Sequence, residues 1–282
     1  MPELPEVETI SRQLDKVLSG KRILKVEVLR EKSFSGKEED LVGKVVDGVA
    51  RRSKMMAITF VNWDKYLVVH LKMTGQLIYL SGSHRVVGGH PTADWINDLP
   101  SKHTRIIIDL SDKAKLFFND LRVFGWMKLM TKDDWESLGK RLPPDVTNKE
   151  FTMEYFTKVL AKSGRSVKLV LMDQEKFGGV GNIYANDALY KAGIDPRRKA
   201  KGLFEKEVGE LYQAVKEVIY LGIKYGGASV DKYVDAAGVG GKYQEHFLVY
   251  QRDGEKCKRD GEVIKKIKIG ARGTYYCPGC QK

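Results

Sequence analysis

The first residues of the chain carry groups that could form a covalent bond to a sugar. Pro2 follows Met1, and a small second residue permits removal of the initiator Met, which would leave the proline as a free secondary amine. An α-amino group has a pKa roughly two units below that of a lysine amine, so more of it is neutral at pH 7. A neutral amine can attack an anomeric carbon and form an iminium. Glu3 and Glu6 lie close in sequence and could donate or accept protons, although clustered Glu residues also simply favour a helix start.

A second set of reactive side chains lies near the other end of the sequence. All three cysteines fall at or after residue 257, too few for a disulfide framework. Their clustering near one end of the sequence indicates a local metal site.

Charge and composition limit the classes of partner. Lys plus Arg number 49 and Asp plus Glu 37, which gives a net charge of +12 and predicts a polyanionic partner, nucleic acid or anionic membrane. Apolar runs are too short to span a bilayer, and the acidic N-terminus has no apolar signal region. We therefore expect no membrane association and a cytoplasmic location. The hydrophobic content of 42% excludes a disordered chain.

The elements that must position these groups change character along the chain. Apolar residues from Val7 to Leu18 recur at helical spacing and predict a leading helix. Short β-rich runs follow to about residue 130, which is typical of a β-sandwich or a flattened barrel. The pattern is helical from about 148 to 225 and strand-like again in the tail. The sequence thus predicts an α+β multidomain fold, with a β-sandwich domain at 1–132, a helical domain at 133–241 and a small cysteine-bearing hairpin at 242–282.

Seven short blocks of the sequence carry a resemblance to a known family. They are Pro2 to Thr9, Arg51 to Lys54, His70 to Gly75, Lys102 to Arg105, Asp120 to Gly125, Gly181 to Ala185 and Tyr276 to Lys282. In their order and spacing these blocks resemble bacterial formamidopyrimidine-DNA glycosylase. The resemblance implies an N-terminal β-sandwich with a leading helix, a helix–two-turns–helix domain and a C-terminal zinc-finger-like β-hairpin.

The resemblance also implies an activity. The protein would be a bifunctional DNA glycosylase and AP lyase of base excision repair. It would excise 8-oxoguanine and formamidopyrimidines from double-stranded DNA and cut the strand by β,δ-elimination. We expect a bacterial monomer associated with the nucleoid when bound to DNA, with one structural zinc ion. The alternatives are an oxidised-pyrimidine glycosylase of the endonuclease VIII type and a non-catalytic damaged-DNA-binding protein of the same fold.

Roles for individual residues follow from the same resemblance. Pro2 would attack C1′ of the damaged nucleotide, Glu3 would assist sugar-ring opening, Lys54 would help β-elimination, and Arg272 would clamp the lesion phosphates and assist δ-elimination. The expected DNA-binding residues are Glu6, His70, Met73, His103, Arg122, Phe124, Arg165, Lys168 and Asn182.

Within that set, Met73, Arg122 and Phe124 would fill the gap left by a flipped base. Asn182 would cap a helix whose free N–H groups bind a phosphate. Lys168 would extend an exposed basic face. The chain departs from the family pattern at Val123, where an arginine is expected, and at Asp260, where a cysteine is expected. The resemblance thus implies a metal site of Cys257, Asp260, Cys277 and Cys280, with one oxygen among three sulfur atoms. Three interpretations stay open: one structural zinc ion held by these four residues, a finger that folds without metal, or a Cys277–Cys280 disulfide, which a reducing compartment disfavours. A stretch that begins at Gly226–Ser229 would form a lid over the flipped base.

Overall fold

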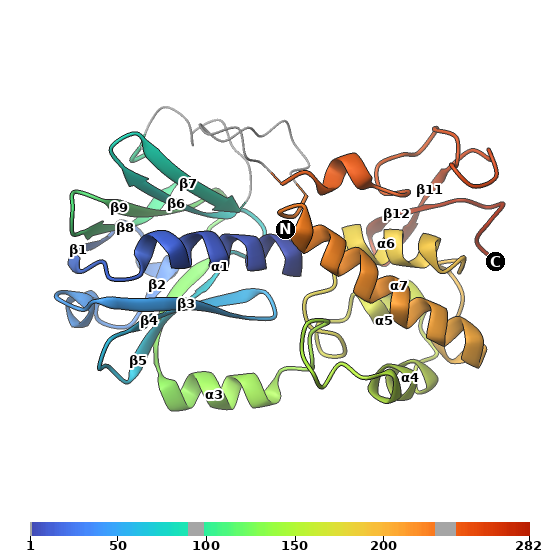
Figure 1. Cartoon of the computed structure of the whole chain (residues 1–282), viewed down its shortest axis with the longest axis horizontal. Coiled ribbons are helices and arrows are strands. Elements are labelled where there is room, and N and C mark those ends of the chain that lie inside the picture. Colours follow the sequence, from blue (N-terminus) through green and yellow to red (C-terminus); the bar gives the residue numbers. More distant parts are fainter. Residues whose placement is uncertain (1, 90–98, 229–240) are drawn as a thin grey trace. The chain divides into compact units, whose positions relative to one another are not determined.

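The computed structural model describes residues 2–89, 99–228 and 241–282. The chain divides into two compact units (Figure 1). Unit 1 contains residues 1–141 and 226–241, and unit 2 contains residues 142–225 and 242–282. The expected lid lies, from Ser229 onward, outside the described residues.

Unit 1 is a β-sandwich of two five-stranded sheets with a leading helix. The first sheet has the strand order β1 (Ile23–Val28), β8 (Thr104–Leu110), β9 (Lys115–Asp120), β6 (Gly75–Ser81) and β7 (His84–Gly89). The second has the order β2 (Phe34–Ser35), β10 (Trp126–Thr131), β5 (Lys65–His70), β4 (Met55–Phe60) and β3 (Val46–Arg52). Two short 3-10 turns, η1 (Glu31–Ser33) and η2 (Glu38–Leu41), and the helix α3 (Lys132–Arg141) complete the unit. The sandwich expected from the sequence is confirmed.

The core of unit 1 lies between the two sheets. Strand β8 alternates buried and partly exposed residues, so that Ile106 and Ile108 point into this core. Helix α1 (Leu4–Leu18) buries one apolar stripe that includes Val7, Ile10 and Leu14. It packs against the edge strands β3 and β7, one from each sheet, so that it lies along one open side of the sandwich (Figure 1). This placement fixes the direction in which the N-terminus emerges.

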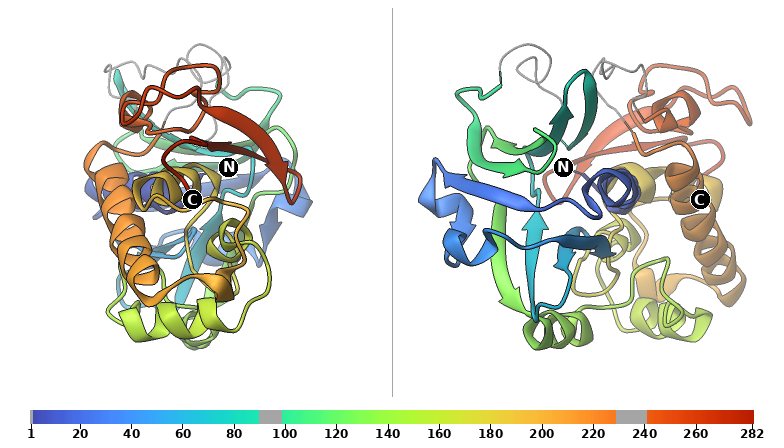
Figure 2. Two further views of the ribbon diagram at one scale, coloured as in Figure 1. Left: turned by 90° about the vertical axis from the view of Figure 1, so that its right-hand side faces the viewer. Right: turned by 60° about the vertical axis from the view of Figure 1, so that its left-hand side comes forward.

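Unit 2 combines helices with a two-stranded hairpin. Its elements are α4 (Met153–Ala161), α5 (Val167–Leu171), α6 (Asn182–Lys191), η3 (Ala200–Gly202), α7 (Glu205–Lys224), η4 (Tyr243–His246), β11 (Lys265–Ile269) and β12 (Arg272–Tyr276). Helix α6 is buried on all sides from Ile183 to Tyr190, because it packs against α5, α7 and β12 (Figure 2, left). Such a helix needs little amphipathic patterning and acts as the central support of the unit.

No helix among the described residues is both long enough and apolar enough to pass through a bilayer.

Candidate active site and nucleic-acid interface

The N-terminal residues are held in place by the start of α1. Pro2 and Glu3 are buried, and Glu3 caps the helix. One oxygen of Glu6, Oε2, accepts the backbone N–H of Glu3 at 2.7 Å, while Oε1 accepts that of Ala228 at 2.8 Å. Gly227, with a φ of +83°, comes so close to Glu6 that a Cβ there would lie 2.8 Å from its side chain. Glu6 therefore fixes the backbone at Glu3 and at Ala228. Its expected contact with DNA stays a prediction.

Lys54 lies in the turn between β3 and β4 and is only 5% exposed. Polar contacts between α1 and β3 show how this turn lies relative to the start of the helix. The carboxylate of Asp15, near the end of α1, accepts the N–H of Val49, whereas Glu8, nearer the start, pairs with Arg51. Moving toward the N-terminus of α1 thus means moving toward the turn after β3. The two segments that carry Pro2 and Lys54 run toward the same end of the sandwich.

His70, at the end of β5, is close to Lys54. Burial, followed by the positive charges of Lys72 and Lys54, lowers the pKa of His70 to about 3. Its Nδ1 accepts the backbone N–H of Lys72 at 3.0 Å, so the neutral ring carries its proton on Nε2. A neutral imidazole with that tautomer is a hydrogen-bond donor at all physiological pH values, which suits a contact to a phosphate or sugar oxygen.

The three residues expected to fill the gap in the duplex are brought together. Nη1 of Arg122 lies 3.2 Å from the sulfur of Met73, and its guanidinium carbon lies 4.8 Å from the ring centre of Phe124. Phe124 is 48% exposed and so contributes little to a core, which is unusual for a large aromatic side chain. A half-buried thioether in contact with an exposed guanidinium and an exposed aromatic ring forms a surface that could stack against bases.

One important residue of this region was not singled out from the sequence. Asp120 is fully buried, and its carboxylate accepts hydrogen bonds from the backbone N–H groups of Arg122, Phe124 and Gly125 and from the hydroxyl of Thr74. It therefore holds the loop that carries Arg122 and Phe124 against the residue next to Met73. The sequence shows only an aspartate four positions before Phe124, and nothing in it indicates that this aspartate is buried.

His103 precedes β8 and is partly buried. Its backbone carbonyl accepts the N–H of Asp120 at 2.9 Å, and its own N–H donates to Ser101 Oγ at 3.1 Å. The backbone of His103 thus belongs to the same turn region as the Asp120 loop. Its side-chain contact with DNA stays a prediction.

In unit 2, Asn182 is the first residue of α6 rather than its cap. The cap is Gly181, which offers no side-chain oxygen, so the expected capping role of Asn182 is wrong. The side chain of Asn186 donates to the carbonyl of Asn182 at 2.6 Å, and its own oxygen accepts the N–H of Tyr275 in β12 at 2.8 Å. The free N–H groups at the start of α6 remain suited to an anion.

The hairpin that carries Arg272 is attached to α5. Lys168 is completely buried, and its ammonium group donates to the carbonyl of Gly273 at 2.9 Å and to the hydroxyl of Thr274 at 2.7 Å. The expectation of an exposed Lys168 is therefore corrected, because its charge is satisfied inside the unit. Arg272 itself is exposed at the hairpin tip. Arg165 is also exposed and forms an ion pair with Asp173 at 2.6 Å.

The four predicted metal ligands converge. Their ligand atoms all lie within 4.8 Å of one another. The sulfur atoms of Cys257 and Cys280 are 3.7 Å apart, and the sulfur of Cys277 lies 3.3 Å from Asp260 oxygens. Sulfur atoms at the corners of a zinc tetrahedron with Zn–S bonds of about 2.3 Å lie about 3.8 Å apart. The residues present therefore fit one structural zinc ion bound by three thiolates and a carboxylate. The carboxylate oxygen, as the fourth ligand, binds zinc less tightly than a thiolate would.

Comparisons with known proteins match this arrangement over the whole chain. Residues 1–127 match the formamidopyrimidine-DNA glycosylase N-terminal domain, residues 142–234 match its H2TH domain, and residues 254–282 match a zinc finger found in FPG and IleRS. The formamidopyrimidine-DNA glycosylase of Pelotomaculum thermopropionicum is 38% identical, with 100% of this chain and 99% of that protein covered. That of Carboxydothermus hydrogenoformans is 37% identical, with both chains covered completely. The chain belongs to the formamidopyrimidine-DNA glycosylase family.

Solved structures of the formamidopyrimidine-DNA glycosylase family agree. The Lactococcus lactis protein in complex with DNA that contains N7-benzyl-Fapy-dG has a TM-score of 0.87 and 32% identity, with both chains covered completely. The same protein bound to DNA with an abasic site also has a TM-score of 0.87 and 32% identity, with 99% of each chain covered. Members of this family are DNA-formamidopyrimidine glycosylases with AP lyase activity. The family expected from the short sequence blocks is thus confirmed, and so is the zinc finger.

Proposed function

We propose that this protein removes oxidised purines from double-stranded DNA and then cuts the strand as an AP lyase. The observation that carries the proposal is the match over the full chain to glycosylases of one family. It is supported by the position of Pro2 and Glu3 at the start of α1, which runs along β3 toward the turn that carries Lys54. The substrates would be 8-oxoguanine and formamidopyrimidines. Double-stranded DNA would be both the binding partner and the substrate. The protein would act as a monomer at the nucleoid in a bacterial cytoplasm.

The chemistry assigned to unit 1 begins with removal of Met1. The neutral amine of Pro2 would attack C1′ as the bond from C1′ to the base breaks, and Glu3 would protonate the ring oxygen of the sugar as the ring opens. The product is an iminium between Pro2 and C1′. Loss of a C2′ proton then expels the 3′ phosphate, and a second elimination expels the 5′ phosphate. Lys54 would help the β-elimination, and Arg272 of unit 2 would clamp the lesion phosphates and assist the δ-elimination.

The duplex would be opened by the group formed by Met73, Arg122 and Phe124. Flipping a nucleotide costs a few kcal/mol of lost stacking, about the amount that an inserted side chain can recover. The guanidinium of Arg122 presents donors to the unpaired base, while the Phe124 ring replaces a stacking partner. Its exposure of 48% supports this role, since a ring placed for the protein core would be covered.

Backbone phosphates would be bound through Asn182, His70 and Arg272. Each sits where the local structure presents a donor: a helix start, a neutral imidazole and an exposed hairpin tip. The net charge of +12 supports a large salt-dependent contribution to affinity.

Borohydride trapping tests the proposal directly. Incubated with a duplex that contains 8-oxoguanine, the protein should form a covalent complex with DNA once the iminium is reduced. Mass spectrometry of the purified protein should show a chain that begins at Pro2. Mass spectrometry of the cross-linked peptide should show that the DNA is bonded to Pro2. Pro2→Gly should lower trapping at least tenfold, while affinity for the duplex stays within about twofold.

Pro5→Ala provides the matched control, because it removes a proline three positions from Pro2, in the first turn of α1, and leaves the N-terminal amine intact. Its trapping should equal that of the unaltered protein. No trapping by the unaltered protein would contradict a lyase and favour a protein that only binds DNA. Undiminished trapping by Pro2→Gly would identify a different amine as the nucleophile, with Lys54 the first candidate.

A further inference from the structure

The sulfur atom of Cys257 lies within hydrogen-bond distance of two groups that are not metal ligands. The hydroxyl oxygen of Tyr190, in the last turn of α6, lies 3.2 Å from it, and the backbone N–H of Arg259 donates to it at 3.4 Å. Cys257 is 4% exposed and Tyr190 3%, so water does not compete for these bonds. When Cys257 binds zinc its sulfur has lost its proton, and Tyr190 must then be the donor.

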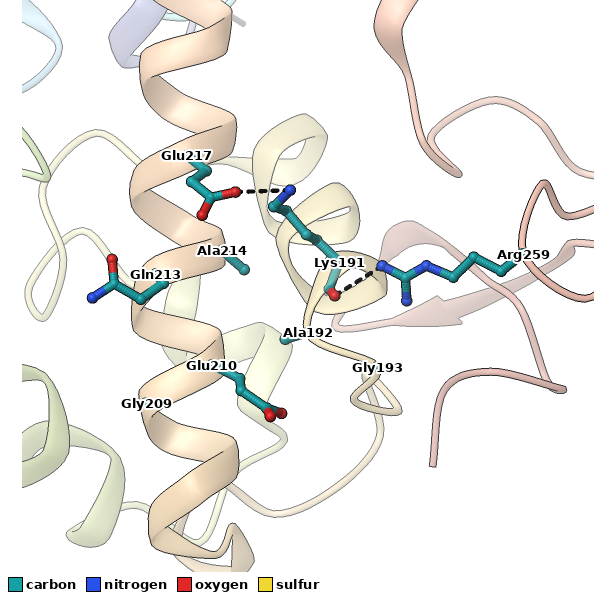
Figure 3. A pocket seen from close by; sticks show the side chains of 9 residues that line it. All are labelled: Lys191, Ala192, Gly193, Gly209, Glu210, Gln213, Ala214, Glu217 and Arg259. Carbon is teal, nitrogen blue, oxygen red and sulfur yellow. Dashed lines mark hydrogen bonds and ion pairs between the residues drawn. The ribbon is translucent and has the colours of Figure 1, made fainter.

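Arg259 contacts the ring and the backbone carbonyl of the same tyrosine. Its guanidinium carbon lies 4.3 Å from the ring centre of Tyr190. The same group donates to the backbone carbonyls of Tyr190 at 2.7 Å and of Lys191 at 2.9 Å. These are the last two carbonyls of α6, and that of Tyr190 also accepts the backbone N–H of Gly193 at 3.0 Å. A cation is favourable at such a helix C-terminus. Figure 3 shows Arg259 reaching across to the carbonyl of Lys191.

We propose that Tyr190 and Arg259 belong to the metal site as outer residues, and that through them zinc binding fixes the C-terminal end of α6. Tyr190 stabilises the Cys257 thiolate by donating a hydrogen bond. Arg259, which lies between the ligands Cys257 and Asp260 in sequence, ties the metal-binding loop to the helix end. Both are positioning residues, since neither provides a ligand atom.

This connection matters more here than in a site with four cysteines. Asp260 is exposed, and a carboxylate binds zinc less tightly than a thiolate, so a larger share of the site's stability must come from the surroundings of the remaining ligands. Helix α6 also carries Asn182 at its other end, and Asn186 in the same helix accepts a hydrogen bond from Tyr275 of β12. Metal, helix and hairpin are therefore joined by bonds within one unit.

Tyr190→Phe tests the first part. It removes only the hydroxyl, and loss of a hydrogen bond to a metal ligand typically lowers metal affinity by about 10- to 100-fold. The zinc dissociation constant, measured by competition with a chromogenic chelator, should rise by that factor. In the Co²⁺-loaded protein the sulfur-to-cobalt absorption band should shift, because one thiolate has lost its donor. Neither measurement depends on enzymatic activity.

Tyr212→Phe is the matched control. Its hydroxyl is also buried and donates to a carbonyl, that of Phe151, at 2.8 Å in the same unit. The zinc dissociation constant of this variant should stay within twofold of that of the unaltered protein, with an unchanged cobalt spectrum. Equal effects in Tyr190→Phe and Tyr212→Phe, or no effect in either, would overturn the role of Tyr190.

Arg259→Gln tests the second part. A cavity of about 560 Å³, lined in part by Arg259, Lys191 and Glu217, lies beside the guanidinium, so the substitution leaves no closed void (Figure 3). Lys191 keeps its ion pair with Glu217 at 2.7 Å. We expect hydrogen exchange at the C-terminal end of α6 to accelerate at least tenfold in the zinc-loaded variant. If Arg259→Gln leaves that exchange unchanged, the metal and the helix end are not coupled through this residue.

Discussion

Val123 occupies a backbone conformation that a β-branched residue rarely adopts. Its φ is +55°, in the left-handed region, between the exposed side chains of Arg122 and Phe124. The family pattern has an arginine here, so the chain keeps the loop shape and loses a polar side chain. The strain is maintained by Asp120, which binds the backbone on both sides of Val123.

Val123→Asn should stabilise the protein by about 1 kcal/mol, because asparagine tolerates the left-handed region far better. The reciprocal control is Asn62→Val, since Asn62 is an exposed turn residue of the same unit with a φ of +51°. That change should destabilise by a similar amount. Urea unfolding of both variants measures the difference, and two shifts of the same sign would show that backbone strain is not the cause.

At this scale the sequence predicts residue types better than their surroundings. Pro2, Lys54 and the four metal ligands could be named because they stand in short blocks that resemble one family. The burial of Lys168 could not be predicted, because it depends on Gly273 and Thr274, about a hundred positions away in the chain. Asn182 was assigned to the wrong helix position for a local reason: its preference for capping is real, but Gly181 can adopt the extended conformation required there.

Asp120 joins separate elements around the cluster of Met73, Arg122 and Phe124. It ends β9, and its carboxylate binds the loop before β10 and the hydroxyl of Thr74 just before β6. Several charge-assisted hydrogen bonds to one buried carboxylate contribute more than neutral ones. The carboxylate therefore determines the position of Arg122 and Phe124 relative to Met73.

Asp120→Asn should destabilise unit 1 by about 2–3 kcal/mol, because an amide offers one acceptor oxygen and leaves buried N–H groups without a partner. Excision of 8-oxoguanine should fall more than the loss of stability explains, since the loop would move. Asp109→Asn is the control: Asp109 lies in the neighbouring strand β8 and forms a partly exposed ion pair with Lys115. It should change the free energy of unfolding by less than about 1 kcal/mol. Chemical unfolding and single-turnover excision on both variants separate stability from activity, and equal excision rates would contradict this role.

Elements with a strong local period were predicted well. The leading helix and the β-rich character of the first 130 residues follow from apolar spacing alone. The strand order could not be predicted, because β1 pairs with β8 and β6 with β9, strands that are distant in sequence. Antiparallel pairing between distant segments depends on tertiary contacts that no local pattern encodes.

Across the whole molecule, the chain passes between the two units at residues 141/142, 225/226 and 241/242. The sequence predicts three domains, with the hairpin of 242–282 separate from the helical segment. The structure joins this hairpin to the helices in one compact unit, through Lys168, Asn186 and Asp187. Composition marks where the pattern changes from helix to strand, but it contains no signal for buried polar contacts across that change.

The metal should therefore stabilise one unit and not the other. All four ligands and the residues that bond to them lie in unit 2, and the hairpin alone buries too little surface to hold its shape. Removal of zinc with a chelator should increase hydrogen exchange in residues 182–191 and 257–280. Exchange in strands β8 and β9 of unit 1 should not change, because their core is the apolar layer between the two sheets.

Asp260→Cys provides the decisive comparison. A fourth thiolate should bind zinc more tightly than the carboxylate does, so this variant should need a higher chelator concentration before exchange in unit 2 increases. Without metal the two proteins should differ little, since Asp260 is exposed and the substitution removes an exposed hydrogen bond, from the N–H of Glu262. Mass spectrometry of exchanged peptides at increasing chelator concentration measures the hydrogen-exchange rates of both units in one experiment. A parallel increase in both units would mean that the chelator destabilises the protein in general. An unchanged exchange rate in unit 2 of the unaltered protein would mean that the finger packs without metal.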